Sequence, residues 1–311
     1  MKKLSSGWII SAGLSAVVCT FILSIPTKAQ IRGVYPLGMS ATNSGVTPES
    51  GFTYSNIFLF YARSELKGPK GELLSTGNNS VLMDMNSFVW VSKREVLGGA
   101  KYSLSATLPI ANNSLTSDIV GAISGGGGFA DSYYQLFILG WQTKRADIRV
   151  VYGFLAPTGR FMAGAKDNVG SGYWTHAISS GQTFYLTTNK ATALSAFQMY
   201  EIHSVQKGTE IHPGQTFDLD YSLTQIIALP DDIHLQVGLV GYGQWQTTDK
   251  TGPTITPEIA KAHYQVNALG FASNLIFPER KVSLGVKYFK EFSNRSTFEG
   301  YSLQISSSIK F

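Results

Sequence analysis

Two pairs of ionisable residues occupy alternate positions in the second half of the chain. Asp218 and Asp220 are two residues apart, and so are Glu201 and His203. In an extended strand, residues i and i+2 point to the same face and lie about 7 Å apart. Such pairs could act as a general acid and a general base, as in a protease built on a barrel. Charges that shape a water-filled interior show the same pattern, so the residues alone leave both interpretations open.

A lipase-type site would need a serine and a histidine on one face of a strand. The nearest candidate is His176, which is followed by Ser179 and Ser180. In a regular strand Ser179 points to the opposite face, and Ser180 lies about 13 Å away along the strand. The five histidines also lack the close spacing of metal ligands. We therefore expect no catalytic residue, cofactor or metal ion, and a lipase or protease is kept as the alternative function.

The strand at the end of the chain indicates what carries these side chains. From Tyr301 to Phe311, apolar residues occupy the odd positions and polar residues the even ones, with Ser307 as the exception. Because side chains alternate between faces, one face of this strand is apolar and the other is polar. The aromatic ending resembles that of bacterial outer-membrane barrel proteins, which turn an apolar face to lipid.

The connections between strand-like segments alternate in length. Short ones such as 144–145 and 230–232 separate long ones such as 157–172 and 248–263. Outer-membrane barrels have short periplasmic turns and longer outer loops, and an even strand number returns both termini to the periplasm. The sequence therefore predicts an all-β fold over residues 52–311, a transmembrane antiparallel β-barrel of about twelve strands.

The amino-terminal region divides into two parts. Lys2 and Lys3 precede a long apolar stretch, and Thr27-Lys28-Ala29 offers the small residues that a signal peptidase reads. This predicts a signal peptide over residues 1–29, with a retained membrane anchor as the alternative. Residues 30–51 contain glycines and prolines that disfavour helix and strand. We interpret this segment as a plug inside the barrel, the alternative being a periplasmic tail.

The charge of the chain belongs partly to the predicted signal peptide. The whole chain has 25 basic and 20 acidic residues. Removal of residues 1–29 takes away three lysines and no acid, which leaves 22 basic against 20 acidic residues, a net charge of +2. We therefore expect no nucleic-acid partner. Cleavage also removes Cys19, the one cysteine, which excludes disulfides and cysteine catalysis in the mature chain.

The polar faces of the predicted strands indicate the character of the barrel interior. Amides, a few acids and aromatic rings share these faces, a mixture that suits sparingly soluble solutes better than sugars or ions. A non-transporting structural barrel is a further alternative. The residues that we predict to line the interior are Asp84, Asn86, Trp90, Glu201, His203, Asp218, Asp220, Gln236, Tyr242 and Gln244.

Several stretches together resemble one protein family. They include Tyr-Pro-Leu-Gly-Met-Ser-Ala-Thr-Asn-Ser-Gly-Val at 35–46, Tyr-Gly-Phe-Leu-Ala-Pro-Thr-Gly-Arg-Phe at 152–161 and Gly-Leu-Val-Gly-Tyr-Gly-Gln-Trp at 238–245; further stretches are 108–115, 125–133 and 167–174. The family is that of outer-membrane barrels described as transporters of the meta-pathway of phenol degradation. The resemblance spans nearly the whole mature chain.

This resemblance implies a passive, porin-like channel in the bacterial outer membrane for small hydrophobic or aromatic compounds. The expected partners are outer-membrane lipids, lipopolysaccharide, the solute itself and the barrel-assembly machinery. That machinery would read the strand that ends at Phe311. The resemblance assigns no role to individual residues.

Overall fold

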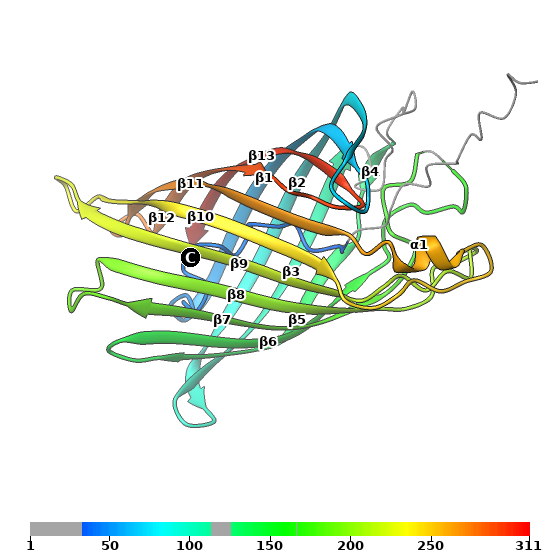
Figure 1. The fold of residues 1–311 in the computed structure, drawn as a ribbon. Helices are drawn as coiled ribbons and strands as arrows, with labels where there is room; N and C mark the ends of the chain where they lie inside the picture. Colours follow the sequence, from blue (N-terminus) through cyan, green and yellow to red (C-terminus); the bar gives the residue numbers. More distant parts are fainter. Residues whose placement is uncertain (1–32, 113–125, 166) are drawn as a thin grey trace, which may run out of the picture.

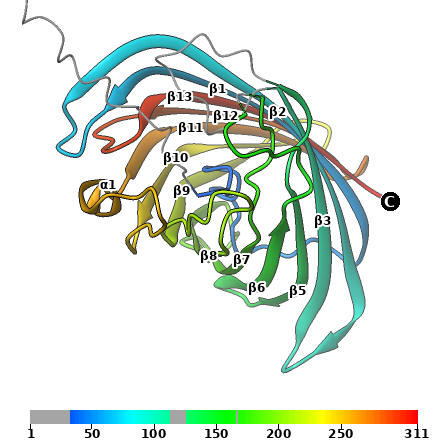
Figure 2. The same cartoon turned by 90° about the vertical axis from the view of Figure 1, so that its right-hand side faces the viewer.

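The computed structural model describes residues 33–112, 126–165 and 167–311. The predicted signal peptide lies outside the described residues, as does most of the loop between residues 111 and 131. The described residues form an antiparallel barrel, and the segment that precedes the first strand runs inside it (Figures 1 and 2).

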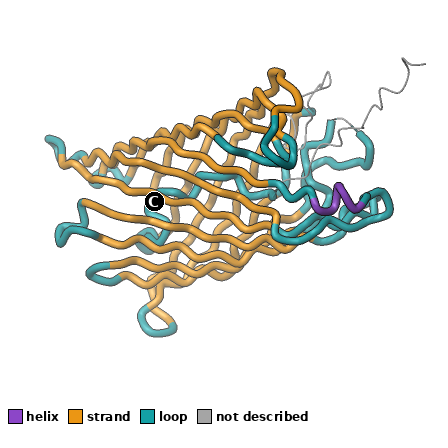
Figure 3. Tube along the Cα trace, in the orientation of Figure 1, coloured by secondary structure: helices purple, strands orange, loops and turns teal. Residues whose placement is uncertain are grey.

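Strands make up nearly all of the wall (Figure 3). They are β1 (Gly51–Lys67), β2 (Leu73–Val96), β3 (Ala100–Asn112), β4 (Gly127–Phe129), β5 (Ser132–Gln142), β6 (Ala146–Ala156), β7 (Thr175–Tyr185), β8 (Thr192–His203), β9 (Thr216–Ala228), β10 (His234–Gln246), β11 (Gln265–Phe277), β12 (Val282–Glu291) and β13 (Phe298–Lys310), with one short helix, α1 (Pro257–Lys261). The three residues of β4 pair only with β3, so the closed wall has 12 strands, as the sequence predicts.

The barrel closes between its first and last strands. β1 pairs with β2 on one side and with β13 on the other, and Thr53 stands opposite Lys310. The other strands of the wall pair with the wall strands that precede and follow them in the chain, β3 pairing with β5 past the short β4. Closure leaves no free sheet edge, whose backbone N–H and C=O groups would find no hydrogen-bond partner in hydrocarbon.

Turns and loops sort to opposite ends of the barrel, as predicted. Residues 97–99, 143–145 and 278–281 make short turns at one end, while 157–174 and 247–264 make long loops at the other. Helix α1 lies among these loops (Figure 1). The turn between β2 and β3 has only three residues, because β2 runs to Val96 and β3 begins at Ala100.

The outer face of the wall is covered by large apolar side chains. Leu239, Phe271 and Ile178 are 67%, 61% and 58% exposed, which places them on the face that points away from the barrel interior. No helix among the described residues is long and apolar enough to span a bilayer.

Residues 33–50 fill much of the interior. Three clusters of buried apolar side chains line the wall, and the segment packs against each of them through Leu37, Tyr35 or Met39. The segment approaches β7 so closely that a β-carbon on Gly181 would overlap the carbonyl oxygen of Ser44. Glycine at this position therefore lets the two backbones meet.

Candidate functional site

Three carboxylates lie on the inner face of neighbouring strands. Glu201 is on β8, and Asp218 and Asp220 are on β9; all three are 0% exposed. Alternation brings the two aspartates to one face, and Met199 of β8 stands opposite Asp218 in the sheet. A buried carboxylate is costly unless hydrogen-bond donors surround it. The residues that donate hydrogen bonds to these three carboxylates therefore show what the carboxylates bind.

Glu201 and Asp220 bind the backbone of the interior segment. The two oxygens of Glu201 accept hydrogen bonds from the N–H groups of Val34 (3.0 Å) and Tyr35 (2.7 Å). Asp220 accepts from the N–H groups of Gly38 (2.9 Å) and Ser40 (3.0 Å). It also accepts from the hydroxyl of Tyr35 at 2.6 Å. Hydrogen bonds to a charged acceptor are the stronger kind, so these two residues fix the path of the segment.

Other strands hold the same segment by its carbonyl groups and amides. Lys287 of β12 donates to the carbonyl oxygens of Gly38 (2.9 Å) and Met39 (2.7 Å). Gln304 of β13 donates to Leu37 O at 2.8 Å. Gln236 of β10 and Asn43 exchange side-chain hydrogen bonds of 2.9 and 3.2 Å. The segment is thus attached to the wall from β8 around to β13.

Asp218 differs from its neighbours because it has no hydrogen bond to the described part of the segment, residues 33–50. Its Oδ1 accepts from Gln244 Nε2 at 2.7 Å, while its Oδ2 has no hydrogen-bond partner among the described residues. Asp218 thus shares the inner face and burial of Asp220 without the same role.

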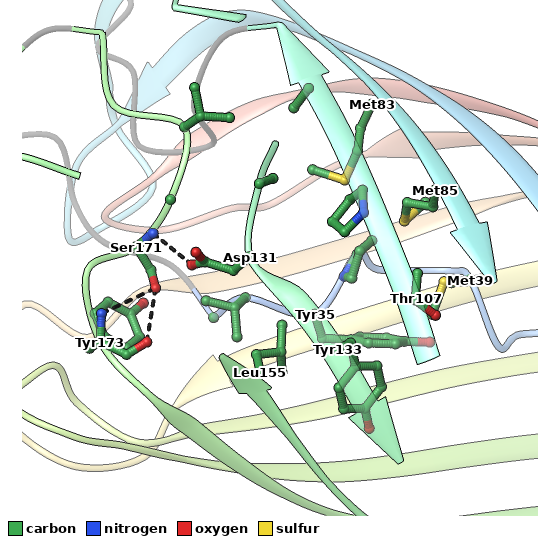
Figure 4. Close-up of a pocket in the computed structure, with 18 of the residues that line it drawn as sticks. Tyr35, Met39, Met83, Met85, Thr107, Asp131, Tyr133, Leu155, Ser171 and Tyr173 are labelled. Carbon is green, nitrogen blue, oxygen red and sulfur yellow. Dashed lines mark hydrogen bonds between the residues drawn. The ribbon is translucent and has the colours of Figure 1, made fainter. Parts of the chain in front are cut away.

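An apolar cavity of about 90 Å³ lies between the segment and the long loops (Figure 4). Four of the side chains that line it are methionines, and three are tyrosines. Methionine adapts its shape and makes favourable contacts with aromatic rings, so such a lining suits a flat apolar molecule. These residues are Met39, Met83, Met85, Met199, Tyr35, Tyr133 and Tyr173.

Asp131 closes the loop side of this cavity. It accepts hydrogen bonds from the N–H groups of Gly159 (3.0 Å) and Ser171 (2.7 Å), and so joins two parts of the long loop (Figure 4). Burial raises the pKa of the Asp131 carboxyl above its ordinary value, while these hydrogen bonds oppose the rise. A molecule that entered the cavity from the loops would contact the segment there, because Tyr35 and Met39 line it.

Seven of the ten residues predicted to line the interior lie on the inner face. They are Glu201, His203, Asp218, Asp220, Gln236, Tyr242 and Gln244, and each is at least nine-tenths buried. Glu201, Asp220 and Gln236 contact the segment directly. Tyr242 packs instead against Phe289, with 4.9 Å between the ring centroids.

The predicted register of β2 is wrong, and Asp84, Asn86 and Trp90 lie on the outer face of the barrel. On this strand Val81, Met83, Met85 and Val91 are buried, and the two methionines pack near Met39. Trp90 is instead 45% exposed. The prediction placed the polar residues of this strand inside. The apolar side chains of the interior segment make part of the interior apolar, so Met83 and Met85 face inward and pack against them.

The sequence interpretation missed several of the residues that contact the segment or line the cavity. Lys287, Met83 and Met85 were not predicted, because their positions matter only once the interior segment is in place. No group of three or more His, Cys, Asp or Glu side chains that could hold a metal occurs in the described part of the chain.

The chain is similar to one protein family over most of its length. The family profile described as "Putative MetA-pathway of phenol degradation" matches residues 62–306. No curated protein sequence matches the chain.

The barrel is also similar to solved structures. The COG4313 outer membrane channel from Pseudomonas putida F1 is 12% identical, with a TM-score of 0.69 over 87% of this chain and 98% of that one. The beta domain of the Bordetella autotransporter BrkA is 10% identical, with a TM-score of 0.47 over 84% of this chain and 100% of that one. At such low identity the first likeness shows the same fold.

Proposed function

This chain belongs to the family described as putative MetA-pathway of phenol degradation, and we propose that it is a passive channel for small hydrophobic or aromatic compounds in the bacterial outer membrane. The observation that carries the proposal is the methionine- and tyrosine-lined cavity behind the outer loops. An apolar molecule that leaves water gains free energy in such a cavity, at roughly 25 cal/mol per Å² of apolar surface buried.

The outer face supports the membrane location. It carries the exposed apolar side chains of every strand in the wall, and aromatic rings pair on it at Phe52, beside the start of β1, and at Phe60, further along that strand. Such a band between aromatic levels is the lipid-facing surface of an outer-membrane barrel. Contact with lipopolysaccharide at the loops, and recognition of the Phe311 strand by the assembly machinery, are parts of the same proposal.

The segment at 30–51 acts in this proposal as a plug that controls passage. Side chains of seven strands, β5, β7, β8, β9, β10, β12 and β13, hold its described part, residues 33–50. A solute in the cavity contacts Tyr35 and Met39 of the segment. Passage to the periplasm then requires the segment to move, or the solute to pass between it and the wall.

The test is solute flux through the purified mature chain in liposomes. Phenol or toluate is compared with a sugar of similar mass, after subtraction of leakage through protein-free bilayers. We expect faster flux of the aromatic compound, because only it gains free energy in the apolar cavity. Equal flux of both solutes would make the barrel a general porin. No flux of either solute would refute a channel that conducts with the interior segment in place.

A matched pair of variants assigns the flux to the cavity. Met199→Trp fills it, because Met199 is 1% exposed and lines its wall. Met162→Trp makes the same chemical change in a loop where the side chain is 70% exposed. We expect only the first to reduce aromatic flux. Equal effects would show that the solute passes elsewhere.

A further inference from the structure

A hydrogen-bonded polar cluster lies on the outer face of the barrel where it closes. The carboxylate of Asp84 accepts from the amides of Asn56 and Asn86, and the hydroxyl of Tyr54 donates to Asn86 Oδ1 at 2.6 Å. Ser307 of β13 stands opposite Asn56 in the sheet. We call these five residues the seam cluster.

The seam cluster lies midway between two aromatic ring pairs on the outer face. Asn56 is four residues from Phe52 and four from Phe60 along β1. Phe52 packs against Phe311 and Phe60 against Tyr301, with 5.9 and 6.1 Å between ring centroids. With a rise of about 3.3 Å per residue and a strand tilt of about 40°, the cluster lies ~10 Å from each aromatic level.

Lipid cannot satisfy a carboxylate at this depth. Hydrocarbon chains offer no hydrogen-bond donor, and the headgroups lie beyond the aromatic levels. Asp84 has two amide donors and forms no ion pair with any described residue. The side-chain oxygen of Asn56 also accepts no hydrogen bond from the described residues. A protein surface with donors at the same depth would complete this set.

The outer face of β7 and β8 offers such a surface. Ser180 donates to Gln198 Oε1 at 2.9 Å, and Gln182 Nε2 donates to Ser180 Oγ at 3.1 Å. The amide nitrogen of Gln198 donates to no described residue. We call these three residues the groove cluster. Two of them, Ser180 and Gln198, border a hollow of about 460 Å³ whose apolar walls include Phe137, Leu139, Val150, Ile178, Tyr200 and Phe217.

The two clusters lie at the same depth on opposite sides of the barrel. Ser180 is four residues from Phe184 and four from His176, which places it at the middle of β7, just as Asn56 lies midway between Phe52 and Phe60. In the order of the closed wall, β8 is the strand farthest from the β13–β1–β2 seam, and β7 lies next to it. Two copies inserted upright in one membrane could therefore bring the clusters together without tilting either barrel.

We propose that the seam cluster of one copy docks on the groove cluster of a second copy of this chain. Acceptors at Asp84 and Asn56 meet the amide donor of Gln198, and exposed rings such as Phe58, 40% exposed, meet the apolar hollow. Because different surfaces meet, the contact is heterologous. Surfaces on opposite sides do not close a ring, so the chain forms rows in the plane of the membrane.

Cysteine cross-linking in intact outer membranes tests this contact while leaving both clusters unchanged. Ile110 of β3 stands opposite Asp84 in the sheet, and Ile178 lines the hollow. Ile110→Cys and Ile178→Cys are made in differently tagged copies and joined by a short bis-maleimide. Only the mixture should form dimers, and a chain with both changes should form a ladder. Cys19 lies in the predicted signal peptide, and Cys19→Ser removes it from the experiment.

Three controls decide the outcome. Leu239→Cys on β10, 67% exposed, replaces Ile110→Cys in the mixture and should give no dimer. Asp84→Leu, in barrels whose folding is confirmed by heat-shifted gel migration, should lower the cross-linked fraction about tenfold, the effect of losing one hydrogen bond to a charged group. Dimers from Ile110→Cys alone, equal yields with the control pair, or no dimer from the mixture would each overturn the proposal.

Discussion

Asp220→Asn should release the interior segment without enlarging or shrinking the side chain. The carboxylate accepts three hydrogen bonds from the segment, from Gly38 N, Ser40 N and the Tyr35 hydroxyl. An amide keeps one acceptor oxygen and turns an NH₂ group toward the remaining donors. At least one hydrogen bond to a charged group is lost, which costs about 1.5–3 kcal/mol. The detached population should therefore rise about ten- to a hundredfold.

Thiol labelling measures this population. Ser44→Cys puts a thiol in the segment at a position that is 1% exposed, so a water-soluble maleimide reacts only when the segment moves. When reattachment is faster than labelling, the rate follows the detached population. Asp220→Asn should raise the rate by the factor given above.

Asp218→Asn is the matched control, because Asp218 has the same strand, face and burial but no hydrogen bond to the segment. Its labelling rate should stay close to that of the parent. If Asp220→Asn leaves the rate unchanged, or if both variants raise it equally, the carboxylate does not hold the segment.

Two further predictions concern the cavity and the outer loops. Phenol should shift the ¹³C-methyl NMR signals of Met39, Met83, Met85 and Met199 by ring currents while leaving exposed Met162 unmoved; equal shifts, or none, would exclude binding in the cavity. Lys250 is 5% exposed, and burial lowers its pKa to about 7. Between about pH 7 and its ordinary pKa of 10.5 the opened loop binds more protons than the closed one, so loop stability should rise with pH in that window. Lys250→Met should remove this pH dependence and protect the loop from proteolysis most at pH 7 and below; a pH dependence that survives the substitution would contradict this assignment.

The fold could be predicted because lipid and backbone chemistry leave few choices. The alternation from Tyr301 to Phe311 and the sorting of short turns from long loops both follow from a wall with lipid on one side. These patterns concern neighbours in the chain, so they can be read from residues near one another. The inner placement of Asp218, Asp220 and Gln236 followed from the same reasoning.

The register of β2 could not be predicted in this way, because both faces of the strand carry polar and apolar residues. Met83 and Met85 face inward because Met39 and Val169 are there to meet them. These packing contacts join residues far apart in the chain, which a pattern of neighbouring residues does not reveal. The seam cluster escaped prediction for the same reason, since polar residues were assigned to the inside wherever a strand offered a choice.

The attachment of the interior segment has a consequence for the order of assembly. Its hydrogen bonds join residues far apart in the sequence: Val34 to Glu201 across 167 positions, and Leu37 to Gln304 across 267. Contacts of such long sequence separation form late. The segment is exported before any strand, yet its last partners arrive with β12 and β13. A chain that stalls before these strands would thus expose unpaired backbone at its beginning, a mark by which periplasmic chaperones and proteases could tell unfinished barrels from finished ones.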